Sequence, residues 1–261
     1  MNTFKDNSRN TYTHNDEASQ KKPTRLNLRQ EIALRPLPFL PLLVILLSTI
    51  FVIWMQFSPV VLQTLQRDPH ALAAGQWWRI LSPLLVDSDG WVQLLTVSIG
   101  FICVGIPAQH WLGWWRWLLL FCSGALAGEI MGYLWQPYGG GNSIALFGLM
   151  GGMLILLLRS KEPQFFLPVF FAIFEVSSLI GQSTGSIWIS IVLWIVGSVL
   201  LRILSPRAGG LRLLLWLAIV ICLIGVISLS ILHDIHGIAL LAGMVVGGLL
   251  SLLSPVREAQ M

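Results

Sequence analysis

Charged residues are scarce in this 261-residue sequence. Asp, Glu, Lys and Arg together make up 11% of the chain, whereas 55% of the residues are hydrophobic and the mean hydropathy is +0.76. Soluble globular domains carry roughly 25% charged residues. The composition therefore excludes an ordinary soluble domain and predicts an integral membrane protein that contacts the lipid bilayer.

Cysteine is scarce too, and the patterns of a metal or nucleotide site are missing. Cys103, Cys122 and Cys222 lie inside apolar runs, where neither disulfide nor ligand spacing can be recognised. No His and Cys cluster has the spacing of a metal site, so we expect no metal and no cofactor. Basic loops and a basic tail account for the net charge of +4, which gives no reason to expect a nucleic-acid partner.

The two ends of the chain differ from the rest. Residues 1–35 are polar and lack apolar periodicity, which is typical of a disordered tail. They also lack the short basic start and small-residue cleavage site of a signal peptide. We therefore expect a membrane domain over 36–255, preceded by this tail and followed by a short tail over 256–261.

Apolar segments recur from Pro38 onward. Their lengths of roughly 16 to 22 residues are close to what a helix needs to cross a hydrocarbon core of ~30 Å. The sequence therefore predicts an all-α, polytopic membrane bundle of about eight transmembrane helices. We expect spans at 38–57, 91–107, 113–135, 143–158, 164–181, 187–204, 211–231 and 234–253.

Basic residues alternate between the connections. Lys and Arg in short loops stay on the cytoplasmic side, and the connections 136–142, 182–186 and 232–233 contain neither. With both termini in the cytoplasm, the inner connections carry the charge, and only Arg67 and Arg79 lie outside. We therefore expect a multi-pass protein of the plasma membrane. The inner basic residues are Arg116, Arg159, Lys161, Arg202, Arg207, Arg212 and Arg257.

Ser143 and His236 each begin a span that runs in the same direction. At about 100° per residue, Gly243 and Gly247 return to within ~20° of the direction of His236. Small residues let membrane helices approach closely, and the span that begins at Ser143 carries Gly148. Packing the two spans together would place a hydroxyl beside an imidazole, as a serine nucleophile with a general base requires.

Three motifs carry a resemblance to a known family. The run GNSIALFGLMGG (141–152) resembles the active-site segment of the rhomboid family of intramembrane serine proteases. HGIALLAGMVVGG (236–248) resembles that family's last core helix, and GQWWRILSPLL (75–85) is similar to its Trp-Arg motif.

The resemblance implies a rhomboid-like fold and cleavage of transmembrane protein substrates. By this resemblance, Ser143 would be the nucleophile and His236 the base, in a dyad that has no carboxylate as a third member. Phe147 would stack on the histidine. Trp78 and Arg79 would be structural, with Arg79 anchoring the first loop.

Three residues depart from the family's pattern around the oxyanion. Ile144 replaces the glycine after the nucleophile, and Gln93 and Val97 replace a His and an Asn. With Gly141 in the preceding loop, the Ile144 N–H can still face an oxyanion, although the side chain is expected to add bulk. Losing one oxyanion donor costs about 10²–10³ in rate, so we expect slow catalysis.

The interval between Ser143 and His236 is about two spans longer than in the family. We expect an inserted hairpin over about 187–231, with both of its helices peripheral and His236 back at the outer end of a core helix. In the alternative, 187–204 is the sixth core helix and Ser143 has no base. The protein would then be an inactive one that binds transmembrane clients.

Simpler explanations remain open for single residues. Ser143 can be a helix N-cap, and His236 an interfacial residue beside Asp234, with His233 as the alternative base. Glu129 lies inside a predicted span, where a carboxylate is stable only if it is neutral, paired or facing water. Such charges also keep a transporter as a third class, although no inverted repeat is visible.

Overall fold

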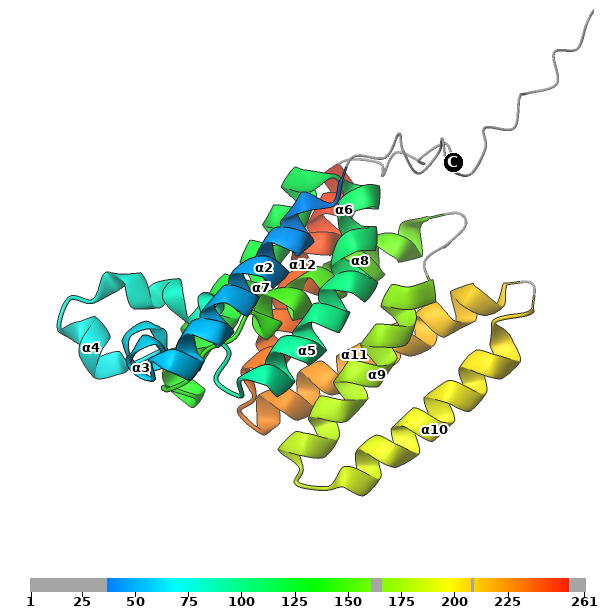
Figure 1. The fold of residues 1–261 in the computed structure, drawn as a ribbon. Helices are drawn as coiled ribbons and strands as arrows, with labels where there is room; N and C mark the ends of the chain where they lie inside the picture. Colours follow the sequence, from blue (N-terminus) through cyan, green and yellow to red (C-terminus); the bar gives the residue numbers. More distant parts are fainter. Residues whose placement is uncertain (1–36, 161–165, 208, 254–261) are drawn as a thin grey trace, which may run out of the picture. The chain divides into compact units, whose positions relative to one another are not determined.

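The computed structural model describes residues 37–160, 166–207 and 209–253 (Figure 1). These segments contain no β-strand, only an isolated antiparallel bridge between Arg67 and Gly139. The predicted tails, 1–35 and 256–261, lie outside them. The helices are α2 (Phe39–Phe57), α3 (Val60–Leu65), α4 (Pro69–Ala73), η1 (Trp77–Ile80), η2 (Ser82–Leu85), α5 (Trp91–Gly100), the π-helical η3 (Phe101–Gly105), α6 (Ile106–Leu112), α7 (Trp114–Trp135), α8 (Ser143–Arg159), α9 (Phe166–Ser183), α10 (Ile187–Leu204), α11 (Gly210–Ile231) and α12 (Ile235–Leu253).

Each of the eight predicted spans coincides with a helical segment. α5, η3 and α6 form one span, Trp91–Leu112, which continues past the predicted end at residue 107. Among the described residues, seven helices are long and apolar enough to cross a membrane, whereas α8 has only 17 residues. At 1.5 Å per residue α8 is about 25 Å long, less than the ~30 Å hydrocarbon core. At least one end of α8 therefore lies below the membrane surface.

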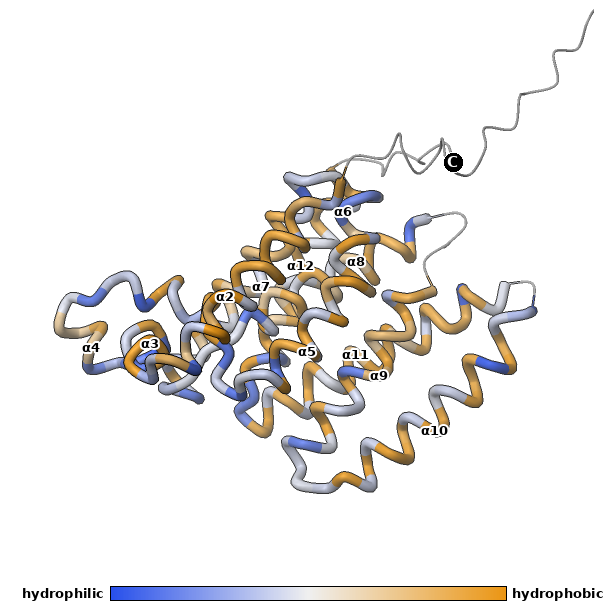
Figure 2. Tube along the Cα trace, viewed as in Figure 1, coloured by the Kyte–Doolittle hydropathy of each residue, from blue (hydrophilic) through white to orange (hydrophobic). Residues whose placement is uncertain are grey.

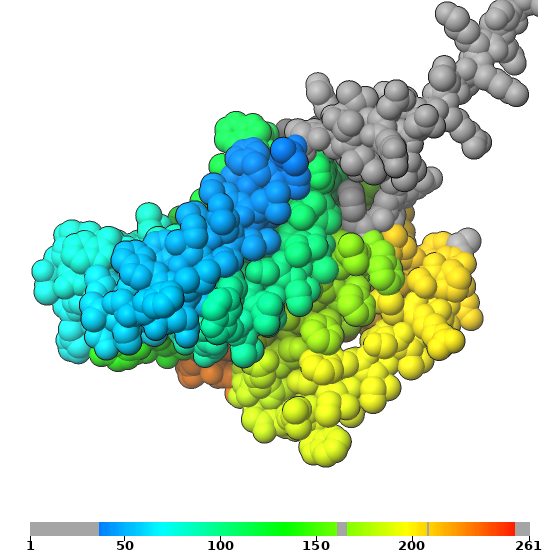
Figure 3. Space-filling model, in the orientation of Figure 1, coloured from blue at the N-terminus to red at the C-terminus, as the bar shows by residue number. Residues whose placement is uncertain are grey.

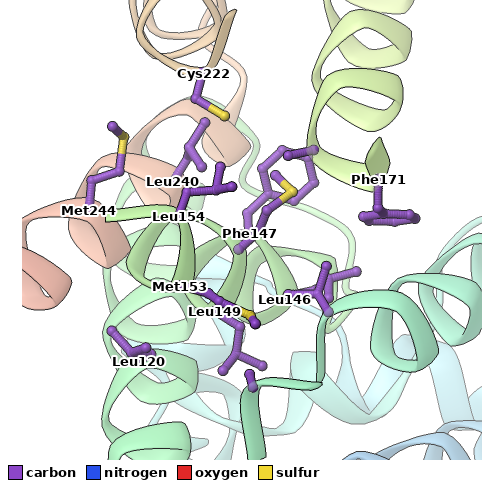
Figure 4. Packing of buried hydrophobic residues seen from close by; sticks show 14 of the residues in the cluster. Leu120, Leu146, Phe147, Leu149, Met153, Leu154, Phe171, Cys222, Leu240 and Met244 are labelled. Atoms are coloured by element: carbon purple, nitrogen blue, oxygen red, sulfur yellow. The ribbon is translucent and has the colours of Figure 1, made fainter. Parts of the chain in front are cut away.

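α8 is enclosed by other helices. Thirteen of its 17 residues are buried. Figure 4 shows its side chains packed among Leu120 of α7, Phe171 of α9, Cys222 of α11 and Leu240 of α12. The other long helices carry many exposed apolar residues, and Figure 2 shows that hydrophobic residues predominate along them. α8 is thus the central element around which the site is built.

Glycines bring α7 and α12 into backbone contact with α8. A Cβ added to Gly124 would lie 2.6 Å from the Cα of Gly148, and one added to Gly243 would overlap the carbonyl oxygen of Gly148. One turn further, a Cβ on Gly247 would lie 2.6 Å from the carbonyl oxygen of Gly152. These pairings make α12 parallel to α8 and fix the register between the two helices.

The first loop folds into the short helices α3, α4, η1 and η2 beside one end of α2 (Figure 1). Arg67 ties this loop to α7, since its Nη1 donates to Oε1 of Glu129 at 2.9 Å and its Nε donates to the carbonyl oxygen of Gln136 at 3.1 Å. Both charged side chains are almost fully buried. Glu129 is therefore paired, one of the ways in which a carboxylate is stable in a membrane helix.

Of the two helices that were predicted to form an inserted peripheral hairpin, one lies at the periphery of the bundle and the other does not. α10 lies at the edge of the bundle against α9 and α11 (Figures 1 and 3), and only Ser190 and Gly197 are buried in it. α11, in contrast, packs against α8, α9 and α12, so the prediction that it is peripheral is wrong. α12 packs along α8, as α7 and α11 also do, whereas α10 lies at the edge, which contradicts the alternative in which 187–204 is the core helix.

The glycine contact predicts a position-specific effect on stability. Gly243→Ala should lower the free energy of unfolding in detergent by about 1–3 kcal/mol, because the new methyl group forces α12 away from the backbone of α8. Gly248→Ala is the matched control on the same helix, since a Cβ there meets nothing within 4 Å. It should be neutral or stabilising by up to ~1 kcal/mol. Equal thermal shifts for the two variants would contradict this packing.

Candidate active site

Ser143 is the first residue of α8, and the N-cap position belongs to Asn142. The interpretation of Ser143 as the N-cap is therefore wrong. Asn142 makes no side-chain cap either, and its Nδ2 donates to Oγ of Ser48 on α2 at 2.6 Å. Because the first four N–H groups of a helix have no carbonyl partner within it, the start of α8 presents backbone donors beside the Ser143 hydroxyl.

His236 lies in the first turn of α12, directly opposite Ser143. Its Nε2 is 2.9 Å from the Oγ of Ser143, although 93 residues separate the two in sequence. The ring of Phe147, one turn into α8, lies with its centroid 4.9 Å from that of the imidazole and its plane inclined by 59°. The two residues singled out from the glycine register are thus in hydrogen-bonding contact, next to the aromatic residue expected there.

A carboxylate that the resemblance did not predict lies on the other side of the imidazole. Oδ1 of Asp234 is 2.7 Å from Nδ1 of His236 and also accepts the backbone N–H of His236 at 3.0 Å. Oγ of Ser183, the last residue of α9, donates to Oδ2 at 2.8 Å. An Asp two residues before a His, at a helix start, signals an Asx turn, whereas no sequence signal points to Ser183.

The electrostatics of Asp234 determine which ring nitrogen carries the proton. Burial opposes ionisation of this carboxyl group, but the hydrogen bonds and positive charge of His236, with the Ser183 hydroxyl, outweigh it and lower the pKa of Asp234 to about 2. An ionised carboxylate only accepts hydrogen bonds. In the neutral imidazole, Nδ1 of His236 is therefore the protonated nitrogen, and the Nε2 lone pair faces the Ser143 hydroxyl.

A cavity of about 170 Å³ opens over the Ser143 and His236 pair. A cavity of this size has room for several water molecules. Residues from the first loop, from the start of α5 and from the segment before α8 form much of its wall. They include Arg67, Ser88, Asp89, Gln93, Gln136 and Gly141.

The glycine run before α8 closes tightly on the first loop. A Cβ on Gly140 would lie 2.7 Å from the carbonyl oxygen of Pro83, and one on Gly141 would overlap the side-chain nitrogen of Gln93. Gly141 also has φ of +153°, a conformation that other residues rarely adopt, and its N–H donates to Pro83 at 2.8 Å. Only glycine fits both positions, which explains the composition of this cavity wall.

Ile144 does not fill the space beside the nucleophile. Its side chain is buried and points at α7, where its Cβ, Cγ2 and Cδ1 lie 2.8 to 3.0 Å from the place a Cβ on Gly128 would take. Most of the expected bulk is therefore directed at α7, while Ile144 still forms part of the cavity wall. The backbone N–H of Ile144 remains in the first turn of α8, beside the Ser143 hydroxyl.

Gln93 and Val97, the two residues of α5 that depart from the family's pattern, differ in their ability to donate hydrogen bonds. Nε2 of Gln93 donates to the carbonyl oxygen of Gly140 at 3.3 Å, and its Oε1 accepts the N–H of Asp89 at 3.2 Å. Because the amide nitrogen carries two hydrogens, Gln93 keeps one donor for the cavity. Val97, one turn further along α5, is buried in the apolar core and has no polar atom to contribute.

The Trp-Arg pair lies in the first loop, away from the imidazole. Arg79 is 5% exposed; its Nη1 donates to the carbonyl oxygen of Gln66 at 2.7 Å, and its own carbonyl oxygen accepts the hydroxyl of Tyr133 on α7 at 2.7 Å. Trp78 is half exposed. These contacts connect η1 with the rest of the first loop and with α7.

The alternative base, His233, does not face Ser143. The ring of His233 lies against Trp135, with centroids 5.3 Å apart, and not against Ser143. In the part of the chain that the structure describes, no three His, Cys, Asp or Glu side chains gather in a way that suits a metal ion.

Comparisons with known proteins point to one family. Residues 74–255 match the family model described as Rhomboid domain. Over 131 residues, the chain is 30% identical to the Bacillus subtilis (strain 168) protein named "Putative rhomboid protease YdcA". That match covers 47% of this chain and 65% of the relative, which is less than two thirds of its length. No solved structure matches the chain.

The direction of the Ile144 side chain predicts a loss of stability on truncation. Ile144→Ala should lower the free energy of unfolding by about 2–5 kcal/mol, because it leaves a cavity between α8 and α7. Ile130→Ala on α7 is the control, since that side chain is 64% exposed on the bundle surface. Thermal unfolding in detergent compares them, and a neutral Ile144→Ala would show that the side chain does not pack as described.

A second prediction concerns Asp87, which follows η2 and is almost fully buried. Burial and the charge of Asp89 raise the pKa of Asp87 to about 7. A raised carboxyl pKa favours the folded state at low pH, and that contribution is lost as pH rises from the unfolded value of 3.8 through about 7. Asp87→Asn should therefore unfold at a higher temperature than the wild type at about pH 8, with a smaller difference at about pH 5. Unfolding temperatures of the wild type and of Asp87→Asn that differ by the same amount at both pH values would contradict a raised pKa for Asp87.

Proposed function

Because this chain belongs to the rhomboid family, we propose that it is an intramembrane serine endopeptidase that cleaves transmembrane protein substrates. Ser143 is the nucleophile and His236 the general base. The observation that carries the proposal is the 2.9 Å contact between Ser143 Oγ and His236 Nε2 beneath a polar cavity. A serine hydroxyl needs such a base to become nucleophilic at neutral pH.

The reaction follows from this contact in two halves. Nε2 of His236 takes the hydroxyl proton as Oγ of Ser143 bonds to the substrate carbonyl carbon, and the resulting tetrahedral intermediate expels the amine, which receives the same proton. The product is an ester on Ser143. A water molecule from the cavity, deprotonated by His236, then attacks the ester; Ser143 regains that proton from His236, and the new carboxylic acid leaves and ionises in water.

The oxyanion of each intermediate forms at the start of α8. The N–H groups of Ser143 and Ile144 and the positive end of the helix dipole stabilise negative charge there. The remaining N–H of Gln93 supplies a side-chain donor at the cavity wall. Val97 supplies none, and the absence of one such donor costs about 10²–10³ in rate. We expect catalysis to be slow for that reason.

The proposed orientation places the site toward the outside of the plasma membrane. The integral membrane protein has basic connections that alternate with connections lacking Lys and Arg, which favours cytoplasmic termini. The starts of α8 and α12 then face outward, and water enters from that side. A substrate helix must unwind locally to bring its carbonyl group to Ser143, since helical carbonyls are already hydrogen-bonded.

A fluorophosphonate probe tests the nucleophile directly. In detergent, the wild type should be labelled and should slowly cleave a helical model substrate, whereas Ser143→Ala should show neither, because the attacking oxygen is gone. His236→Ala should lose at least about 10³-fold in labelling rate, because the hydroxyl has lost its base. The measurement is the labelling rate by in-gel fluorescence.

Ser251→Ala, at the far end of α12, is the matched serine control and should label like the wild type. Labelling that survives Ser143→Ala would refute the assignment of the nucleophile. A folded wild type that no probe labels would instead favour a protein that binds transmembrane clients without cleaving them.

A further inference from the structure

We propose that Asp234 is a positioning residue for His236, so that this enzyme works with a Ser143, His236 and Asp234 triad in place of a dyad. The inference rests on the proposed function and names a residue that the resemblance does not supply. Its basis is a continuous chain of hydrogen bonds from the nucleophile to the end of α9.

The geometry places the three groups in the order that a triad requires. Nε2 of His236 is 2.9 Å from the Ser143 hydroxyl, and Nδ1 is 2.7 Å from Oδ1 of Asp234. The two ring nitrogens are thus used on opposite sides of the imidazole. In serine proteases with this arrangement, the carboxylate holds the tautomer that leaves Nε2 free to accept a proton and stabilises the imidazolium that forms.

Ser183 fixes the orientation of the carboxylate itself. Its hydroxyl donates to Oδ2 of Asp234 at 2.8 Å while Oδ1 faces the imidazole, so both carboxylate oxygens are occupied. Asp234 and His236 are only 14% and 18% exposed. Reduced contact with water strengthens a charged hydrogen bond, and the proton that reaches His236 during acylation therefore meets a held negative charge.

A purely structural role for Asp234 accounts for only part of these contacts. Oδ1 accepts the backbone N–H of His236 at 3.0 Å, which is a helix cap for α12. A cap does not require the contact with Nδ1 or the hydroxyl of Ser183. Asn caps a helix as well as Asp does, so Asp234→Asn can keep the cap while it removes the charge and replaces one acceptor oxygen with an NH2 donor.

Other charged side chains lie near His236 without a hydrogen bond to its ring. Glu175 of α9 acts on it electrostatically, and Arg67 and Asp89 lie on the wall of the same cavity. Among the charged side chains that the structure describes, Asp234 is the one hydrogen-bonded to the imidazole. Substitution of Asp234 therefore measures the effect of the hydrogen-bonded carboxylate separately from that of the other charged groups.

The test is the pH dependence of cleavage and of probe labelling by Asp234→Asn in the full chain. We expect kcat to fall by about 10²–10⁴ while KM stays within about twofold, because the imidazolium has lost its partner. The acid limb of the pH–rate profile should move to lower pH, since a neutral amide no longer favours the protonated imidazole. A merely structural residue would lower kcat or the amount of folded protein without moving that limb.

Two further variants calibrate the result. Asp68→Asn is the matched control, because Oδ1 of Asp68 caps α4 through the N–H groups of His70 and Ala71 at 2.9 and 3.1 Å, far along the chain from the imidazole. It should leave the rate and the pH profile unchanged. Ser183→Ala should lower kcat by about 3- to 10-fold, as the loss of one hydrogen bond to a carboxylate predicts.

Each outcome separates the two proposals. If neither the wild type nor any variant reacts with the probe, the protease itself is refuted. If the wild type reacts and folded Asp234→Asn keeps its rate and pH profile, the triad alone is refuted and a dyad suffices. Should Asp234→Asn not fold, Ser183→Ala and the proton NMR spectrum of the wild type decide. A strongly deshielded imidazole proton that disappears in His236→Ala supports the triad, and its absence overturns it.

Discussion

The distance between α8 and α12 is the constraint on which the rest of the site depends. Apolar helices gain little by burying apolar surface from lipid that is equally apolar, so their association relies on close packing. Gly148 and Gly243 supply that packing by bringing the two backbones into direct contact. Because the helices are parallel and in register there, their first residues meet, and the Ser143 and His236 side chains reach each other without distortion of either helix. Polar chemistry at the helix starts is thus a consequence of small residues one to two turns deeper.

Much of this arrangement could be predicted from periodicity. Apolar runs located every long helix, and the register of Gly243 and Gly247 relative to His236 indicated the face that packs on α8. Such signals are local, because each depends on residues within one helix. The long interval between Ser143 and His236 did not obscure the pairing, since α10 carries no comparable stripe and lies at the edge of the bundle.

The features that escaped prediction depend on contacts between distant segments. Glu129 is hydrogen-bonded to Arg67, which is 62 residues away in the sequence, and Asp234 to Ser183, which is 51 residues away. Nothing near either residue in the sequence identifies its partner. The direction of a side chain at a helix start is equally non-local, which is why Ile144 was expected beside the oxyanion and is found against α7. The partly core position of α11 is a third case, because a uniformly apolar helix gives no indication of which face contacts protein and which contacts lipid.

The contact between Ile144 and Gly128 links the identity of two positions on different helices. The volume of an isoleucine after the nucleophile is accommodated only because α7 has no side chain at the facing position. Relatives with a large residue after the serine should therefore carry glycine at the α7 position, and those with glycine after the serine are free to carry a larger residue there. A relative with large residues at both positions would have no room for the side chain against α7, and a bulky residue would then close the start of α8. Relatives that vary the two positions together would keep the start of α8 accessible.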